Sequence, residues 1–518
     1  MTDHLPVAAV VLPMIAAPLL VIIGHRSVVR YASIAVAWTV FAMCAWLLMW
    51  ARAEGVVRYD IGGWEPPYGI EYSIDVLGGY VMSIVSFVSA VVLTASGRSV
   101  VSEVPANKHT LFYATFLLCL TGLLGMCATG DLFNVFVFLE ISSLSQYALI
   151  SLGRSRRALL ASLQYLIVGT VGATFFLIGI GLLYQLTGTL NIADLADRLP
   201  RESGSRTLLV ALAMMAVGQA IKMAVFPVHT WLPNAYAEAP SVVTAFVAAT
   251  STKVSVYAFV RIVYTIYGHK FAFDLLPLDT ELTILALFGI YVASGAAIFQ
   301  TDVKRILAYS SVAQIGYMIL GVSLDTPDGL AGGLVHLLNH AMIKGALFLG
   351  VAAVVYRIGS SRLEDWRGIG RTMPVTALAI AVAGLALIGV PLTCGFVTKW
   401  MLMTAMFRAG HPMLAALMVG SSLLAVVYVW RIVETMYFAT PRDVPATAGP
   451  NRDCPVLVAA TWVLAGGCVW FGVVTRSTAD PATAAAEQLF QRSPVTAGLP
   501  DDGPVSIADR SEPAEARS

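Results

Sequence analysis

Apolar segments of about twenty residues follow one another along almost the whole of this chain. A segment of that length crosses the ~30 Å hydrocarbon core of a bilayer as a helix, and a helix satisfies its own backbone polar groups in lipid. Only 12% of the 518 residues are charged and 58% are apolar, whereas about 25% are charged in a typical soluble protein. The sequence therefore predicts an all-α polytopic membrane protein with about 14 transmembrane helices. The candidate spans are residues 5–23, 32–50, 74–95, 109–128, 131–151, 158–186, 206–229, 241–266, 281–299, 303–323, 329–357, 373–406, 411–438 and 453–475.

Basic residues in the loops give the expected orientation. Counted with the adjoining ends of the spans, the loops that follow odd-numbered spans and connect to the next hold fifteen Lys and Arg residues, and those that follow even-numbered spans hold eight. Since positive loops stay in the cytoplasm, we expect both termini outside. The first apolar run follows Met1–His4 with no basic segment before it, which favours a retained span over a cleaved signal peptide.

Several classes of function are disfavoured by composition. A net charge of +1 provides no basic field for nucleic acid. The six cysteines form no C-x-x-C pair, which argues against a zinc site, an iron–sulfur centre or a disulfide framework in this chain alone. No P-loop motif occurs. We expect no metal and no cofactor.

Five charged residues interrupt the apolar spans: Lys222, Lys253, Lys344, Lys399 and Glu140. At roughly 3 kcal/mol each, their insertion costs on the order of 15 kcal/mol. Lysine, unlike arginine, can lose its proton when desolvated, so a buried Glu–Lys pair that forms and breaks is a proton switch. A static ion pair that fixes helix packing is the alternative for one pair, but five groups on five spans favour a proton path.

Two spans carry helix breakers beside these lysines. Lys222 is followed by Pro227, His229 and Pro233, and Pro391 precedes Lys399. Interrupted helices at matching places indicate inverted-repeat transport folds, although a packing kink would explain either break alone. Spans 4–8 and 9–13 would form two five-helix repeats, the second inverted.

A polar stripe runs along the eleventh expected span. His336, His340 and Lys344 are four residues apart and share one helix face. Zinc is disfavoured because no H-E-x-x-H acid is present, so we expect a proton relay. Hydrogen bonds between helices are the alternative, above all for His336.

The chain is expected to divide into five parts. They are an N-terminal three-helix region at 1–108, a first repeat at 109–266, a second repeat at 281–438, a last helix at 453–475 and a disordered tail at 476–518. In the tail we expect at most a short amphipathic helix around Pro481–Phe490, because little apolar surface is available.

Five motifs resemble the antiporter-like membrane subunits shared by respiratory complex I, membrane-bound hydrogenases and Mrp-type Na+/H+ antiporters. They lie at Asp131–Glu140, Phe226–Pro240, Thr252–Tyr257, Asp302–Ser311 and His336–Lys344. The outer-loop run Tyr59–Ile70, the Ala-Glu-Ala-Pro ending at Pro240, and the chain length make the D-type subunit of the Mrp antiporter the member that the chain resembles most.

The resemblance implies a role for each residue. Glu140 and Lys222 would be the charged pair of a first half-channel, Lys253 the connecting lysine and Lys399 the end of a second half-channel. His336 and His340 would join the central hydrophilic axis. Departures from the usual pattern at Thr230, Asn234 and Leu392 leave all of these titratable groups in place. The predicted proton-transfer residues are Glu140, Lys222, Lys253, His336, His340, Lys344 and Lys399, supported by His229, Pro227, Pro391 and Tyr257.

The expected function is that of a proton-translocating subunit of a multisubunit Na+ or K+/proton antiporter in a bacterial cell (inner) membrane. Its partners would be other membrane subunits, lipid, protons and monovalent cations, with no nucleic acid. Such a subunit is a transporter component rather than an enzyme. The alternative is a pump subunit of complex I or of an energy-converting hydrogenase, and a solute carrier that acts alone is a third possibility. The sequence does not identify the exchanged cation or the subunit that carries it.

Overall fold

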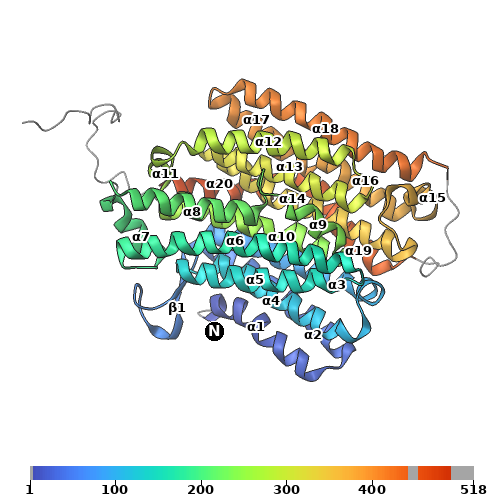
Figure 1. The fold of residues 1–518 in the computed structure, drawn as a ribbon, viewed down its shortest axis with the longest axis horizontal. Coiled ribbons are helices and arrows are strands. Elements are labelled where there is room, and N and C mark those ends of the chain that lie inside the picture. The colour runs from blue at the N-terminus through green and yellow to red at the C-terminus, as the bar shows by residue number, and fades with distance from the viewer. Residues whose placement is uncertain (1–3, 203, 441–452, 492–518) are drawn as a thin grey trace, which may run out of the picture.

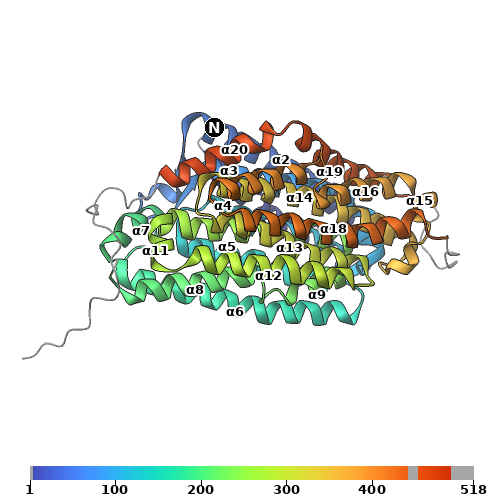
Figure 2. The same cartoon turned by 90° about the horizontal axis from the view of Figure 1, so that it is seen from above.

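A computed structural model describes residues 4–202, 204–440 and 453–491. These residues form a bundle of helices that run along its long axis, as the two views at right angles show (Figures 1 and 2). The expected all-α membrane fold is confirmed. The helices are α1 Leu5–Ile23, α2 Arg26–Glu54, α3 Val76–Glu103, α4 His109–Ala128, α5 Leu132–Ser151, α6 Arg156–Thr187, α7 Ile192–Arg198, α8 Arg206–Met223, α9 Trp231–Glu238, α10 Ser241–Val260, α11 His269–Leu275, α12 Leu278–Ile298, α13 Val303–Ser323, α14 Pro327–Ile358, α15 Ile369–Thr372, α16 Pro374–Ile388, α17 Cys394–Arg408, α18 Pro412–Tyr437, α19 Pro455–Val473 and α20 Arg476–Gln491. Short 3-10 turns are η2 Ile61–Gly63, η3 Ala106–Lys108, η4 Leu199–Glu202 and η6 Leu363–Trp366, and η5 Arg261–Ile266 is a π-helix that continues α10.

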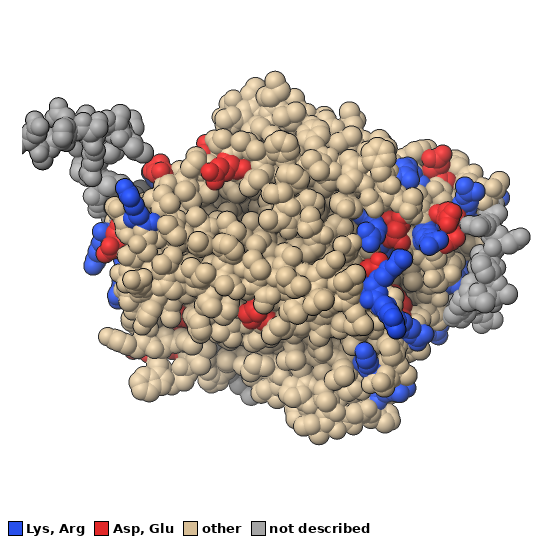
Figure 3. Space-filling model, viewed as in Figure 1, with Lys and Arg blue, Asp and Glu red and all other residues tan. Residues whose placement is uncertain are grey.

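Thirteen helices of the described chain are long and apolar enough to cross a membrane. The remaining expected span, the twelfth, consists of α16 and α17, each 15 residues long. Most basic side chains on the face shown in Figure 3 gather at the end where α15 lies, and a broad band almost free of charge separates them from the opposite end. The apolar band is the surface that lipid requires.

Matching contacts relate the two halves of the bundle. Asp131 caps the start of α5 and pairs with Asn191, just after the 32-residue α6. Asp302 caps the start of α13 and pairs with Arg362, just after the 32-residue α14. The first contact lies near α7 and the second near α15, at opposite ends of the bundle (Figure 1). The same local motif at opposite ends is what an inverted repeat produces.

Both predicted helix breaks are present. The seventh span divides into α8 and α9, with Ala224 in the left-handed region at φ 60°. The twelfth divides into α16 and α17, with Gly389 at φ 92° and Leu392 at φ 70°. The first break lies beside α10 and α13, each 94% buried over its most apolar window, and the second lies beside α14, which is 78% buried over that window.

A short hairpin was not expected from the sequence. Strand β1 (Val57–Asp60) pairs antiparallel with β2 (Glu71–Ile74), in a segment where the sequence indicates only an outer loop. The hairpin lies at the same end as α7 and α11 (Figure 1). Its second strand is joined to the α4–α5 turn by a bridge between Tyr72 and Thr129.

Residues 476–491 of the expected tail form α20, which includes the short amphipathic helix expected around Pro481–Phe490 but is longer and packed against the bundle. Ala482, Ala485, Ala486 and Leu489 are at most 2% exposed and recur at helical spacing. Their small side chains let α20 pack closely against α14 and α3. Composition alone concealed this periodicity. The rest of the expected tail, residues 492–518, lies outside the described residues.

The first and last described residues lie at one end of the bundle. His4 contacts Tyr59 of the hairpin, with 3.1 Å between Nδ1 and the hydroxyl oxygen. Phe490 packs against His269 at the start of α11, with ring centroids 4.3 Å apart. A chain whose two ends lie on the same side of a bundle crosses the membrane an even number of times.

Gly395 allows α17 to approach α16 at the second break, and we predict that Gly395→Ala destabilises the protein. A Cβ at this position would lie 1.8 Å from the carbonyl oxygen of Ala386, and backbone does not move away cheaply. We expect a loss of about 1–3 kcal/mol or more, measured as a lower melting temperature in detergent. Gly466→Ala is the control, because no atom lies within 4 Å of its added Cβ. Equal melting temperatures would contradict the close approach.

Candidate functional site

Lys222 and Glu140 face each other between α8 and α5. The Lys222 Nζ lies 3.6 Å from the Glu140 Oε1, and the two side chains are 4% and 23% exposed. That oxygen has no hydrogen-bond partner among the described residues. The pair is therefore close enough for strong attraction but is not locked by a hydrogen bond.

Hydroxyl groups hold the lysine instead. Lys222 Nζ donates to Ser143 Oγ at 2.9 Å and to the Tyr147 hydroxyl at 3.3 Å, both on α5. A cavity of about 10 Å³ is lined by Lys222 and by Ser251 and Ser255 of α10, and a volume of that order holds roughly one water molecule. The buried Ser251 hydroxyl has no partner among the described residues. The lysine thus borders a polar, water-sized gap that leads toward α10.

Lys253 occupies the centre of α10. Its side chain is fully buried, and Nζ donates to the Ala248 carbonyl at 2.5 Å and to Thr252 Oγ1 at 3.3 Å. It lies near enough to His336, His340 and Lys344 to interact electrostatically with all three. No carboxylate lies within ion-pair distance of it in the described part of the chain.

The two histidines of α14 stack on each other. The His336 and His340 rings are 5.7 Å apart and nearly parallel, at 4°. Both side chains are buried and none of their ring nitrogens has a hydrogen-bond partner among the described residues. Buried polar groups without partners are costly, so these nitrogens are places where water or a proton is expected.

The two remaining lysines, Lys344 and Lys399, each bind one backbone carbonyl and one serine hydroxyl. Lys344 Nζ donates to the Leu307 carbonyl at 2.9 Å and to Ser310 Oγ at 2.5 Å, both on α13. Lys399 Nζ donates to Ser422 Oγ of α18 at 2.8 Å and to the Ile388 carbonyl at 2.6 Å. The Ile388 carbonyl ends α16, so it is one of those that the break between α16 and α17 leaves without a helical partner.

Together these side chains form one path, which we call the central axis. It runs from Glu140 and Lys222 across the small cavity to α10, which carries Lys253, continues to the α14 stripe and ends at Lys399, which interacts electrostatically with His336. The structure thus brings together all seven residues that the sequence predicts. The axis consists of Glu140, Lys222, Lys253, His336, His340, Lys344 and Lys399.

The four supporting residues lie at the breaks and beside the axis. Pro227 and His229 lie between α8 and α9, and Pro391 lies between α16 and α17. His229 is buried, with Nδ1 unpartnered among the described residues. Tyr257 lies one turn beyond Lys253 and donates to the Cys127 carbonyl at 3.0 Å.

Comparisons with known proteins identify the family. The family described as "NADH:quinone oxidoreductase/Mrp antiporter, TM" matches residues 129–425. The chain belongs to this family. That range includes the entire central axis, and the resemblance expected from the five motifs is confirmed.

Members of this family with two different names are similar to the chain. NADH-quinone oxidoreductase subunit N of Desulforudis audaxviator (strain MP104C) is 44% identical over 84% of this chain and 87% of that protein. The D-type subunit of the Na(+)/H(+) antiporter of Alkalihalophilus pseudofirmus (strain ATCC BAA-2126 / JCM 17055 / OF4) is 30% identical over 83% of this chain and 86% of that protein. A chain in the structure of the Mrp complex from Dietzia sp. DQ12-45-1b superposes with a TM-score of 0.86 at 28% identity, over 95% of this chain and 98% of that chain.

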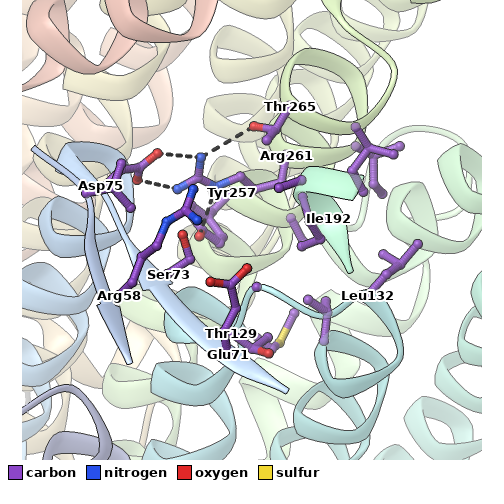
Figure 4. A pocket seen from close by; sticks show the side chains of 18 of the residues that line it. Arg58, Glu71, Ser73, Asp75, Thr129, Leu132, Ile192, Tyr257, Arg261 and Thr265 are labelled. Atoms are coloured by element: carbon purple, nitrogen blue, oxygen red, sulfur yellow. Dashed lines mark hydrogen bonds and ion pairs between the residues drawn. The ribbon is translucent and has the colours of Figure 1, made fainter. Parts of the chain in front are cut away.

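One buried ion pair, between Arg261 and Asp75, was not predicted from the sequence. Arg261, near the end of the expected span 241–266, lies in η5, where both terminal nitrogens bind the two carboxylate oxygens of Asp75 (Figure 4). The partners are 186 residues apart, so local spacing cannot pair them. The usable signal was the four-residue spacing of Lys253, Tyr257 and Arg261, which puts all three on one helix face.

One buried lysine outside the axis, Lys304, has a structural role. Lys304 at the start of α13 lies 3.8 Å from Glu103 and donates to the Ala239 carbonyl at 2.9 Å. Glu103 also accepts from the backbone and hydroxyl of Ser241. This cluster ties the ends of α3, α9, α10 and α13 together. The described residues contain no group of three His, Cys, Asp or Glu side chains that could hold a metal ion.

The Glu140–Lys222 geometry predicts a coupled effect on stability. Removing one member of a buried pair leaves the other uncompensated, whereas replacing both is often nearly neutral. We expect Glu140→Gln and Lys222→Met each to lower the melting temperature in detergent, and the double variant to lose less than the sum of the two. Glu281→Gln and Lys270→Met, at exposed positions, are the charge-matched controls. Strictly additive losses would show that the two side chains do not interact.

Proposed function

We propose that this chain is the proton-translocating subunit of a multisubunit Na+ or K+/proton antiporter. The observation that carries the proposal is the Glu140–Lys222 pair, held at 3.6 Å without a hydrogen bond and placed at one end of a buried series of titratable groups. A pair that only fixed packing would gain from the shorter, hydrogen-bonded geometry.

The pair would work as a switch. While the Glu140 carboxylate faces Lys222, the charged ammonium is stabilised. When the carboxylate moves away, only the hydroxyls of Ser143 and Tyr147 remain, and the lysine gives up its proton more readily. The water-sized cavity beside Ser251 leads that proton toward α10 and Lys253.

Beyond Lys253, mutual repulsion moves the proton onward. Lys253 and Lys344 interact electrostatically with each other and with both histidines, so adding a positive charge at one disfavours charge at the next. The unpartnered nitrogens of His336 and His340 can each accept and release a proton without breaking a hydrogen bond to another described residue. Lys399, bound to Ser422 and the Ile388 carbonyl, is the last acceptor.

The proposal includes an orientation and partners. The distribution of basic loops puts the α15 end in the cytoplasm and both termini outside. The similar Mrp chain is part of a complex, so we propose that this chain assembles with other membrane subunits. The axis holds four lysines and only one carboxylate, and the lysines repel metal cations. We therefore propose that the Na+ or K+ path lies in a neighbouring subunit.

The second candidate is a proton-pumping membrane subunit of an NADH:quinone oxidoreductase or of an energy-converting hydrogenase. The observation that favours it is the 44% identity to a protein named as such an oxidoreductase subunit. The superposition on the Mrp chain, which covers 95% of this chain, supports the antiporter. A superposition of equal coverage on a chain of the membrane-bound sulfane sulfur reductase, an archaeal respiratory membrane complex, supports the redox-driven candidate as well. The proton path through the axis would be the same in both.

The first test of the proposed function is proton flux in everted membrane vesicles that contain the chain with its operon neighbours. We expect added Na+ or K+ to collapse a preformed pH gradient, followed with a fluorescent dye, and we expect Glu140→Gln and Lys222→Met to abolish the response although the complex still assembles. Glu281→Gln and Lys270→Met should respond like the wild type. Wild-type flux in both axis variants would refute the scheme.

Purification separates the two candidates. We expect the tagged chain, solubilised in mild detergent, to bring down only membrane subunits that lack iron. The measurement is mass spectrometry of the complex together with its iron content. Stoichiometric iron–sulfur subunits, combined with vesicles that respond to no cation, would establish the redox-driven candidate instead.

A further inference from the structure

A cavity at the hairpin end of the bundle has no place in the central axis. It encloses about 110 Å³, enough for several water molecules. Its walls come from the hairpin, the α4–α5 turn, α7, and the junction of α10 with η5. Figure 4 shows polar side chains from these separate segments pointing into one space.

Glu71 of β2 is the unsatisfied group in this cavity. The residue is 3% exposed. Its Oε1 accepts from the Asn191 side chain at 2.8 Å, and its Oε2 is buried with no hydrogen-bond partner among the described residues. A carboxylate oxygen in that position requires water, a proton or a cation, because leaving it bare is costly.

The cavity reaches toward the central axis along α10. Tyr257 and Arg261 line it and follow Lys253 at intervals of four residues, each about 6 Å further along the helix. Arg261 Nε donates to the Tyr257 hydroxyl at 3.0 Å. The turn that holds Arg261 is a π-helix, a feature that is frequent at functional sites. A polar face thus connects Lys253 to the cavity.

We propose that this cavity is a proton port, which connects the central axis with the solution on the hairpin side of the membrane and in which Glu71 takes up or releases the proton. The proposal rests on the proposed function, because a port has a role only if the axis carries protons. Through this port, the first repeat (residues 109–266) would open to the solution at the end of the bundle where α7 lies.

The charge of the cavity favours a proton over a metal cation. Both oxygens of Asp75 are engaged by Arg261 and are not available to a metal, and the guanidinium group of Arg58, which also lines the space, opposes the entry of Na+ or K+. A proton needs only one acceptor, which the second oxygen of Glu71 supplies. The titratable and charged groups around Glu71 are Arg58 and Asp60 on β1, Asp75 before α3, Asp131 in the α4–α5 turn, and Tyr257 and Arg261 on the α10–η5 junction.

The test varies the pH on each side of everted vesicles separately, with the whole complex present. We expect Glu71→Gln, which can still accept from Asn191, to slow cation-driven proton flux roughly fivefold or more, and to remove its dependence on the pH of the hairpin-side solution. The cation concentration for half-maximal flux should not change. Glu71→Asp, which keeps an acid, should retain the pH dependence.

Glu65→Gln is the matched control, since Glu65 is an exposed acid of the same hairpin, and it should behave like the wild type. Wild-type dependence on hairpin-side pH in Glu71→Gln would overturn the port. A changed cation requirement in that variant would also overturn it, because Glu71 would then bind the metal cation.

A second measurement does not depend on flux. A membrane-impermeant carbodiimide with a labelled amine reacts with protonated carboxyl groups, and mass spectrometry locates the label. We expect Glu71 to be labelled only from the hairpin side, and faster at lower pH on that side. Failure to label Glu71 would overturn the port. Absence of flux in the wild type together with normal labelling of Glu71 would instead count against the proposed antiport function.

Discussion

The cost of removing ammonium groups from water governs this structure. Among the described residues, three lysines of the central axis bind neutral oxygens only: Lys253 binds the Ala248 carbonyl, Lys344 the Leu307 carbonyl and Lys399 the Ile388 carbonyl, each with a nearby hydroxyl. Such dipoles stabilise a charged lysine less than a carboxylate does. Since no carboxylate of the described chain is fixed beside them, these groups can exist in either protonation state within the same packing. The packing around these three lysines is therefore compatible with both the charged and the neutral form of each.

The helix breaks follow from the same requirement. A continuous helix uses its own carbonyls, whereas a broken one leaves several without partners. At the second break, Lys399 uses such an oxygen, because it donates to the Ile388 carbonyl at the end of α16. At the first break, the Trp231 indole donates to the Ile221 carbonyl at 3.0 Å, directly before Lys222. The proline and glycine residues that interrupt the spans thus place acceptors at membrane depth, where lipid offers none.

Local sequence patterns predicted the spans, the breaks and every member of the axis, because each of these is a departure from apolar periodicity that one segment displays by itself. Contacts between distant segments were not predictable in this way. No feature of the sequence around Asp75 indicates that it pairs with Arg261, 186 residues away. The hairpin strands at Val57–Asp60 and Glu71–Ile74 are too short and polar to be distinguished from a loop in the sequence. Helix α20 is longer and more closely packed than the short helix expected around Pro481–Phe490, for another reason. Its buried face consists mainly of alanines, which contribute little hydrophobicity but allow close packing, so the composition resembles that of a disordered tail.

The imbalance of charge along the axis has a consequence for coupling. Four lysines share one carboxylate, and that carboxylate lies at the first lysine, Lys222. Moving Glu140 therefore changes the electrostatic energy of Lys222 most, and the remaining lysines respond through repulsion between neighbours. In the proposed function, a signal that enters at Glu140 would pass along the axis with the positive charge itself as its carrier. In the proposed function, a metal cation would meet the same repulsion with no acceptor at the far end, so an axis of this composition would carry the proton, the one cation that a lysine can hold.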